Sequence, residues 1–385
     1  MRISFKSLSI TAFVAMIVLG TVSCSDSEDN TGNENQEILE KAVPQYVNNV
    51  VITTYKSLAD ETIDLYEALV ALKAGKTDAN VRKAADEWIA TRKYWELSEA
   101  FLFGAAADFG IDPHIDTWPL DIAALTSLLN NSDYLASMDS EDGPAWAGEK
   151  LGPSLLGFHG IEYILYANGN IKSADKITNN ELIYAVAVAG DLRNQCIRLE
   201  AAWAGLANVS TDKQDLIEEF ELGVTMGNKS YYGADMINAG NAGSTYRTIL
   251  DANEAIIEGC ITIADEVATM KIGKPNTGVD PNYLESPYSY NSKVDFIDNI
   301  KSIQNAYLGG VDANNRGVSV SDYIKVIDPV LNTKVVDAIT NAIAKIEAIP
   351  YPFDTNYTTV QAEAAMNACN ELADVLTEAK VALRK

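Results

Sequence analysis

The spacing of apolar residues constrains the fold of this chain more than any other feature of its sequence. From residue 38 onward, apolar residues recur every three or four positions, which places them on one face of an α-helix. The first segment of this kind ends at Gly75, and its apolar positions are Val47, Val50, Val51, Tyr55, Leu58, Ile63, Leu65, Leu69 and Leu72. Because the alternating pattern of strands is nearly absent, the sequence predicts an all-α protein.

Breaks rich in glycine, asparagine and proline separate the further helices that the pattern predicts. Their expected ranges are about 80–104, 119–129, 153–167, 181–207, 213–232, 243–272, 292–308, 333–348 and 357–383. Pro119 fits the first position of its helix, with Asp121 in the first turn. We expect two packed helical bundles, over residues 38–208 and 209–385, although helix counting alone also suits one large bundle.

The N-terminal segment has the features of an export signal. Arg2 and Lys6 precede an apolar run and small residues, so residues 1–23 are predicted to be a signal peptide. The segment resembles a bacterial lipoprotein signal, in which Cys24 becomes lipidated; an ordinary secretory signal or an uncleaved anchor are the alternatives. We expect residues 24–37 to form a flexible acidic tether and the protein to be exported and lipid-anchored to the outer membrane, on its periplasmic or cell-surface face.

Acidic residues far outnumber basic ones, and the formal net charge is −25. A surface of this charge repels nucleic acid and raises the local concentration of cations. Solubility alone is the simpler explanation of the same charge. In either case the sequence predicts no nucleic-acid partner.

One of only two histidines in the chain lies in an apolar run, three residues before a glutamate. His159 and Glu162 therefore share one face of the helix predicted over residues 153–167. A helix that is apolar nearly all round is buried. A buried imidazole and carboxylate need partners, and the sequence leaves open whether these are protein groups, water or a metal ion.

Other polar residues stand where apolar neighbours are expected to bury them. Arg92 and Glu99 recur with Trp88 and Trp95 in one helical stripe, which indicates either a structural ion pair or part of a site. In the second half, a polar loop precedes the helix that carries Asp295. The side chains of Asp295, Asn299 and Ser302 share a face of that helix, which we expect to be solvated.

Common catalytic signatures such as H-E-x-x-H and G-x-S-x-G are missing from the sequence. With two histidines in all, a site of three histidines is impossible. The pair of His159 and Glu162 supplies two ligands, whereas catalytic zinc usually has three protein ligands and a water. Any metal site must therefore recruit oxygen ligands from elsewhere, a mixed set that suits iron, manganese or zinc.

Four segments together resemble the imelysin-like family. The most specific is the G-x-H-x-x-E pattern of Gly157, His159 and Glu162; the others are residues 98–104, 118–121 and 285–309. The resemblance implies a two-domain helical fold with this pattern near the domain junction. Tyr288 and Tyr290 stand where a Phe and a His are expected, so this loop lacks a histidine ligand.

The resemblance also implies which residues form the site. The implied metal ligands are His159, Glu162, Glu99 and Asp121, and Glu162 or Glu99 would be the catalytic base of a peptidase. The further residues expected to line the site are Arg92, Trp118, Ser286, Ser289, Asn291 and Asp295. The family is named for a peptidase and is usually classed with metallopeptidases, while several members belong to iron-uptake systems or are iron-regulated envelope proteins.

We therefore predict an envelope lipoprotein that binds a cation (iron or zinc), or a small ligand carrying it, at the domain junction and that is linked to iron uptake. A metallopeptidase using a metal-bound water is the first alternative. The second is a module that binds surface glycan or peptide by stacking on Trp88, Trp95 and Trp118. The metal, the substrate and the oligomeric state are not determined by the sequence.

Overall fold

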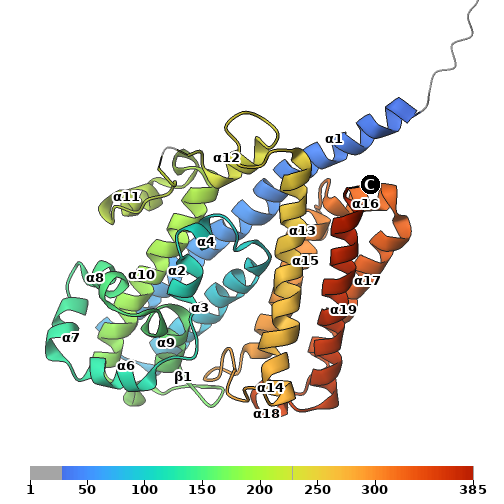
Figure 1. Ribbon diagram of the computed structural model, residues 1–385. Coiled ribbons are helices and arrows are strands. Elements are labelled where there is room, and N and C mark those ends of the chain that lie inside the picture. Colours follow the sequence, from blue (N-terminus) through green and yellow to red (C-terminus); the bar gives the residue numbers. More distant parts are fainter. Residues whose placement is uncertain (1–27, 228, 385) are drawn as a thin grey trace, which may run out of the picture.

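The computed structural model describes residues 28–384 except residue 228, and helices make up most of it (Figure 1). The predicted signal peptide, residues 1–23, and the predicted lipid site Cys24 lie outside the described residues. Among the helices that are described, none combines the length and the apolar character needed to span a membrane.

The first group of helices packs around α10 (Asn179–Ala204), which is buried along most of its length. Its main neighbours are α2 (Ile52–Ala74), α3 (Asp78–Glu96), α8 (Gly143–Lys150) and α9 (Gly157–Leu165). Thr178 begins α10 with a capping box, because its hydroxyl accepts the Glu181 amide and the Glu181 carboxylate accepts the amide of Thr178.

The second group packs four long helices side by side (Figure 1). These are α13 (Ile249–Glu266), α15 (Ser292–Leu308), α17 (Pro329–Glu347) and α19 (Val360–Ala382). The shorter α16 (Val320–Ile327) covers one end of them. A π-helical turn, η6 (Val267–Lys271), continues α13 and leads into α14 (Gly273–Thr277).

The remaining elements are short and connect these helices. The helices among them are α4 (Ala105–Asp108), α5 (Ile111–Ile115), α6 (Ile122–Leu129), α7 (Ser132–Met138), α11 (Thr211–Glu219), α12 (Tyr232–Ile237) and α18 (Phe353–Asn356). The 3₁₀ turns are η2 (Glu99–Phe101), η3 (Pro153–Leu155), η4 (Ala174–Lys176) and η5 (Leu206–Asn208). An antiparallel pair of strands, β1 (Tyr166–Ala167) and β2 (Asn170–Ile171), follows α9.

The helices form these two groups, and the groups pack together on a continuous hydrophobic core. The prediction of an all-α fold of two packed helical bundles is therefore confirmed. The helix α1 (Glu28–Tyr46) precedes a π-helical turn, η1 (Val47–Val51), and then α2, yet it packs against α13 and α16 of the second group. Residues from both halves thus stabilise one another. The boundary near residue 208 stays a prediction.

Polar contacts join α15 to the first bundle. The Ala100 amide donates to Ser302 Oγ at 3.0 Å, and Asn299 Nδ2 donates to Glu96 Oε2 at 2.5 Å. The expectation of a solvated polar face on α15 was wrong, because Asp295, Asn299 and Ser302 are all buried. This face meets buried polar groups of α3 and η2 instead of water.

Several helix limits differ from the expected ones. Residues 28–37 of the predicted tether belong to α1, whose later turns are held in the core by Leu39 and Val43. Pro119 follows a cis peptide bond and precedes α6, whose first turn is capped by Asp121. The helix predicted over 80–104 ends at Glu96, because the chain turns there to place η2 against α13.

Candidate functional site

Buried charged side chains gather where the two bundles meet. They come from α3, η2, the end of α5, α9, η6, the loop before α15 and α15 itself. The members are Arg92, Glu96, Glu99, Asp116, His159, Glu162, Lys271, Glu285 and Asp295, which we call the junction cluster. Ions buried this deeply are stable only when paired or hydrogen-bonded, so their contacts decide what the cluster does.

Arg92 lies at the centre of the junction cluster with no exposed surface. Its guanidinium contacts Asp116, lies 2.5 Å from Glu96 Oε1 and lies 3.0 Å from Glu285 Oε1. Trp95 Nε1 donates to Asp116 Oδ2 at 2.7 Å. Although burial alone would raise it, the pKa of Asp116 is well below its usual range because of Arg92 and His159.

His159 faces Asp116 on one side and Glu162 on the other. Its Nε2 lies 3.1 Å from Asp116 Oδ1, and its Nδ1 lies 3.6 Å from Glu162 Oε2. Burial lowers the pKa of His159, but the two carboxylates outweigh it and raise the pKa to about 9. Neither ring nitrogen has a well-directed hydrogen bond to the described residues. The imidazole is thus buried, charged at neutral pH and incompletely satisfied.

Glu162 anchors a loop of the second bundle through one of its oxygens. Oε1 accepts hydrogen bonds from the Tyr288 amide at 3.0 Å, the Ser289 amide at 2.8 Å and Ser289 Oγ at 2.7 Å. Oε2 has no hydrogen-bond partner among the described residues. With Oε1 occupied by three donors, only Oε2 is available to a ligand.

The other residues predicted in the loop before α15 converge on Asp295. Ser286 Oγ donates to Asp295 Oδ2 at 2.6 Å, and Asn291 Nδ2 donates to Asp295 Oδ1 at 2.6 Å. Burial, the first cause, and the nearby Glu96 raise the pKa of Asp295 to about 7. Ser286, Ser289 and Asn291 therefore hold carboxylates in place and are themselves occupied.

Lys271 is a member of the cluster that sequence reasoning missed. The π-helical turn after α13 buries its side chain, and its Nζ lies 2.8 Å from Glu285 Oε1 and 3.7 Å from both Glu96 Oε2 and Glu99 Oε1. Turns of this kind are frequent at functional sites. The signal that could have identified it is a lone lysine between Met270 and Ile272 in an apolar helix.

Glu96, Glu99 and Asp116 offer the most compact set of acidic ligand atoms in the cluster. One oxygen of each lies within 4.8 Å of the others. Burial, together with the negative charge of Glu96, raises the pKa of Glu99 well above its usual range despite the nearby Lys271. Oxygens at this separation suit a hard or borderline cation, and His159 beside Asp116 adds one nitrogen.

Carboxyl groups outnumber cationic groups in the cluster. Three cationic groups, Arg92, Lys271 and His159, face six carboxyl groups, which are Glu96, Glu99, Asp116, Glu162, Glu285 and Asp295. Burial raises the pKa of Glu285 to about 8, against the opposing effect of Lys271. The deficit of positive charge is met in part by protons on such carboxyl groups.

Asp121 does not join the cluster. It is exposed, and its Oδ1 accepts the Ala124 amide at 2.8 Å as the N-cap of α6. Within the described residues no hydrogen bond or ion pair links it to His159 or Glu162. Its place beside the histidine is taken by Asp116, from the same acidic stretch; the second histidine, His114, pairs with Asp191 at 2.7 Å instead.

The tryptophans divide into two kinds. Trp88 and Trp95 are fully buried, and their indole nitrogens donate to Phe158 O and Asp116, so neither can stack on a sugar. Trp118 is partly exposed and contacts Tyr283 with the rings tilted by 48° and their centroids 3.8 Å apart; its ring lies 6.4 Å from that of His159. Of the three tryptophans that the glycan-binding alternative requires, only Trp118 is therefore accessible to a sugar.

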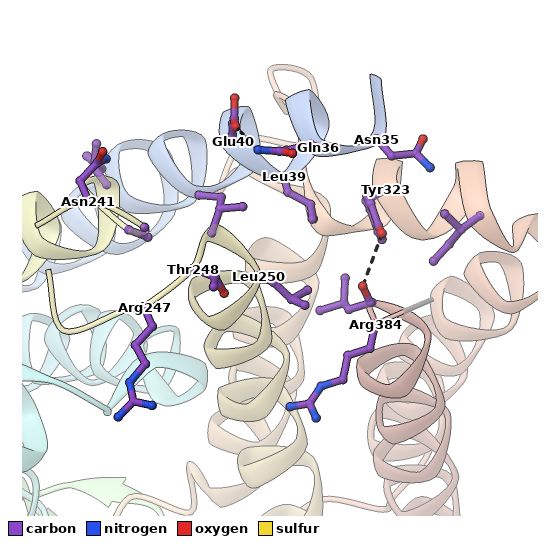
Figure 2. Close-up of a pocket in the computed structure, with 16 residues that line it drawn as sticks. Asn35, Gln36, Leu39, Glu40, Asn241, Arg247, Thr248, Leu250, Tyr323 and Arg384 are labelled. Atoms are coloured by element: carbon purple, nitrogen blue, oxygen red, sulfur yellow. Dashed lines mark hydrogen bonds between the residues drawn. The ribbon is translucent and has the colours of Figure 1, made fainter. Parts of the chain in front are cut away.

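A cavity of about 230 Å³ connects the junction cluster to the surface. Its lining includes Glu99, Asp116 and Lys271 of the cluster, with Asp112 and Trp118 nearer the mouth. A larger groove of about 1040 Å³ lies elsewhere, between α1, the start of α13 and α16, and it holds none of the predicted site residues (Figure 2). The smaller cavity, unlike this groove, therefore gives access to the charged groups.

Comparison with known proteins agrees with this architecture. Iron-regulated protein A of Synechococcus elongatus is 26% identical over 350 residues, which cover 91% of this chain and 87% of that protein. The crystal structure of an iron-regulated protein A precursor from Parabacteroides distasonis is 28% identical and covers 90% of this chain and 95% of that one, with a TM-score of 0.76. An imelysin-like protein from Psychrobacter arcticum, 13% identical, shares the fold, with a TM-score of 0.61 over 91% of this chain and 94% of its own.

The match extends to the family level. The family model described as Imelysin matches residues 51–383, which include α2 through α19 and every member of the junction cluster. The chain therefore belongs to the imelysin family.

Proposed function

We propose that the protein binds a metal cation, iron or zinc, in the junction cluster. The observation that carries this proposal is the buried surplus of carboxyl groups beside unsatisfied ligand atoms. Oε2 of Glu162 and Oε2 of Glu285 are buried without a hydrogen bond to any described residue, and both nitrogens of His159 face carboxylates without a well-directed hydrogen bond. Such orphaned atoms are rare and need an explanation, which a bound cation supplies.

The donor set fits this cation chemically. Glu96, Glu99 and Asp116 supply three oxygens, and His159 supplies an imidazole nitrogen once its proton has left. Carboxylates with one imidazole suit iron, manganese or zinc better than thiolate-seeking metals. Two relatives are named as iron-regulated proteins, which favours iron among these, and the role that we propose is linked to iron uptake.

Lys271 adds a competitor to the site. Its ammonium lies 3.7 Å from Glu96 and from Glu99, where it neutralises the oxygens that a metal would use. Binding of a divalent or ferric ion would move this ammonium away from Glu99 and release protons from Glu99 and His159. We therefore expect affinity to rise with pH.

Calorimetry on chelator-treated protein tests the proposal with Fe²⁺ and Zn²⁺. We expect one site, proton release that depends on the buffer, and affinity at least about tenfold weaker in Glu99→Gln and in His159→Ala, or about 1.4 kcal/mol. Glu61→Gln is the matched control, since Glu61, Asp64 and Glu87 form an equally compact but more exposed trio. The proposal would be contradicted if the parent bound no metal, or if Glu61→Gln lost as much metal affinity as Glu99→Gln and His159→Ala.

A metallopeptidase remains the alternative because Glu96 and Asp116, with the imidazole of His159, could hold a catalytic ion with a water. Glu162 is poorly placed as its base, since Oε1 already accepts three hydrogen bonds from the 288–289 loop. Glu99 lines the open cavity and is the better placed carboxylate. Cleavage of an unfolded protein by the metal-loaded parent, lost in Glu99→Gln, would support this alternative.

We also propose that the protein is exported and anchored through a lipid on Cys24, as the N-terminal sequence indicates. The membrane would then be its second partner, on the periplasmic or the cell-surface face. Labelling of the parent but not of Cys24→Ala with radioactive palmitate in the host checks this attachment.

A further inference from the structure

A second cavity, of about 470 Å³, lies at the bundle junction beside the one that reaches the cluster. One wall comes from η2 and the residues that follow it, and the other comes from one face of α13 between Ala255 and Glu266. Glu99, Leu102, Asp112 and Glu266 line both cavities. Its volume is in the range of small-molecule sites.

Three carboxylates in this cavity lack hydrogen bonds. In the described part of the chain no donor reaches Glu99, Asp112 or Glu266, and the one cation paired with them is Lys271, 3.7 Å from Glu99. Glu99 is only 8% exposed, yet it lines the cavity. Glu99 is buried while Asp112 and Glu266 are half-buried, and carboxylates gathered in this way favour a further positive partner.

Apolar and aromatic side chains form the rest of the wall. Leu102 and Phe103 come from the segment after η2, Tyr246 from the loop before α13, and Ile263 from α13 itself. Hydrated metal ions gain nothing from such surfaces, whereas alkyl groups gain from burial and ammonium groups from aromatic faces. The wall thus favours a cation that carries its charge on an apolar stem.

The side chain of Lys271 shows that such a group is compatible with this environment. Its butyl stem is buried, and its ammonium lies among Glu285, Glu96 and Glu99 from three different segments. Glu99 also lines both cavities together with Asp112 and Glu266. A ligand ammonium would there find three carboxylates that one lysine only partly neutralises.

We propose that this cavity binds an alkyl ammonium ligand with at least two positive charges, of the diamine or polyamine class, through Asp112, Glu266 and Glu99. The three carboxylates have room for a second ammonium among themselves, since Glu258 on the same wall is already paired with Lys380 at 2.5 Å. The site is distinct from the proposed metal ligands in its use of Asp112 and Glu266, and it shares Glu99 with them. Binding of diamine and of metal is therefore expected to be mutually unfavourable.

Calorimetry of the full chain with 1,4-diaminobutane and spermidine, in buffer of physiological salt, tests the proposal. Butylamine carries one charge and 1,4-butanediol none, so they separate charge from the apolar stem. We expect the diamine to bind at least about tenfold more tightly than butylamine and butanediol not to bind. A short lysine-rich peptide is titrated as well. If this peptide binds more tightly than spermidine does, the ammonium groups belong to protein side chains and the polyamine assignment is overturned.

Variants distinguish this site from the proposed metal site. Asp112→Asn with Glu266→Gln should weaken diamine binding at least about tenfold, while Glu61→Gln, outside the cavity, leaves it unchanged. His159→Ala should weaken metal binding and leave diamine binding as in the parent, so either proposal can fail alone. Unchanged diamine affinity in the double variant, with circular dichroism showing it folded, would overturn the inference, as would equal affinity for butylamine and diamine.

Discussion

The guanidinium of Arg92 contacts carboxyl groups from four parts of the chain. Glu96 lies one turn further along the same helix, Asp116 ends α5, Glu285 belongs to the loop before α15, and Asp295 belongs to α15, with Oδ1 3.9 Å from Nε. Its planar fork of donors allows several acceptors at once, which an ammonium cannot match. One residue of the first bundle thus neutralises two acidic groups of the second.

Replacing Arg92 by Met should destabilise the protein strongly. The substitution keeps the apolar bulk but leaves buried carboxylates without their counter-ion, which costs about 3–5 kcal/mol. Protons can replace the lost charge, so the loss in stability should be larger at pH 8 than at pH 6. Urea unfolding followed by circular dichroism measures the difference.

Lys83→Met is the matched control, because Lys83 pairs with Glu87 at 2.7 Å on the exposed side of the same helix. Surface pairs of this kind contribute little, so its unfolding midpoint should equal that of the parent. Equal effects of the two substitutions would show that Arg92 is not needed to balance the junction.

At the scale of elements, the start of α9 aligns His159 with its neighbours. Gly157 has a φ of +69°, and a side chain on it would overlap the carbonyl oxygen of Ile115 at the end of α5. This close approach of Gly157 to Ile115 also brings Asp116, the next residue after Ile115, beside His159. The helix predicted from residue 153 begins at Gly157 because the chain has to make this contact first.

Gly157→Ala should therefore separate α5 from α9. The positive φ alone costs about 1–3 kcal/mol in an alanine, and the overlap with a backbone oxygen adds to this. We expect a lower melting temperature together with weaker metal binding, because Asp116 and His159 move apart.

Gly152→Ala provides the comparison, since Gly152 has a φ of −76° and no neighbouring atom lies within 4 Å of the place that an alanine methyl would take. Its melting temperature and metal affinity should match those of the parent. A Gly157→Ala protein as stable as Gly152→Ala would show that the contact between α5 and α9 is not required.

At the scale of the whole molecule, the junction between the bundles contains more acidic than basic side chains. The pKa values of Asp112, Asp295 and Glu285 are raised to about 6, 7 and 8, and burial is the first cause of each shift. These groups bind protons more tightly in the folded than in the unfolded chain. The two bundles are therefore held together most firmly when the junction is protonated or holds another cation.

The stability of the protein should fall as pH rises from 5 to 9. A carboxyl group with a raised pKa stabilises the fold fully below its unfolded value of about 4, and the contribution is lost as pH passes its folded pKa. His159 acts in the same direction, since its contribution is present below about 6.5 and is lost through pH 9. Asp116, with a lowered pKa, opposes this trend only at acidic pH below about 4.

Melting temperatures measured across this range test the prediction. Asp295→Asn should flatten the slope, and saturating Zn²⁺ should raise the melting temperature more at pH 8 than at pH 5.5, because protons compete for the same oxygens. A melting temperature that stays constant or rises from pH 6 to pH 9 would contradict the raised pKa values.

The sequence by itself determined the all-helical fold and the burial of His159 and Glu162. Both follow from local periodicity: the repeat of apolar residues defines which face of a helix is buried, and a spacing of three places two side chains on the same face. The buried stripe of Trp88, Arg92 and Trp95 was predictable for the same reason. Such arguments need only the geometry of one helix.

Only the tertiary structure decided which charged groups meet at the junction. Asp116 rather than Asp121 faces His159, and Lys271 and Glu285 join from the second bundle. Spacing along the chain cannot distinguish two carboxylates in one acidic loop, because the close packing of α5 on α9 selects between them. Contacts between segments more than a hundred residues apart depend on how whole helices pack, and no local pattern records that packing.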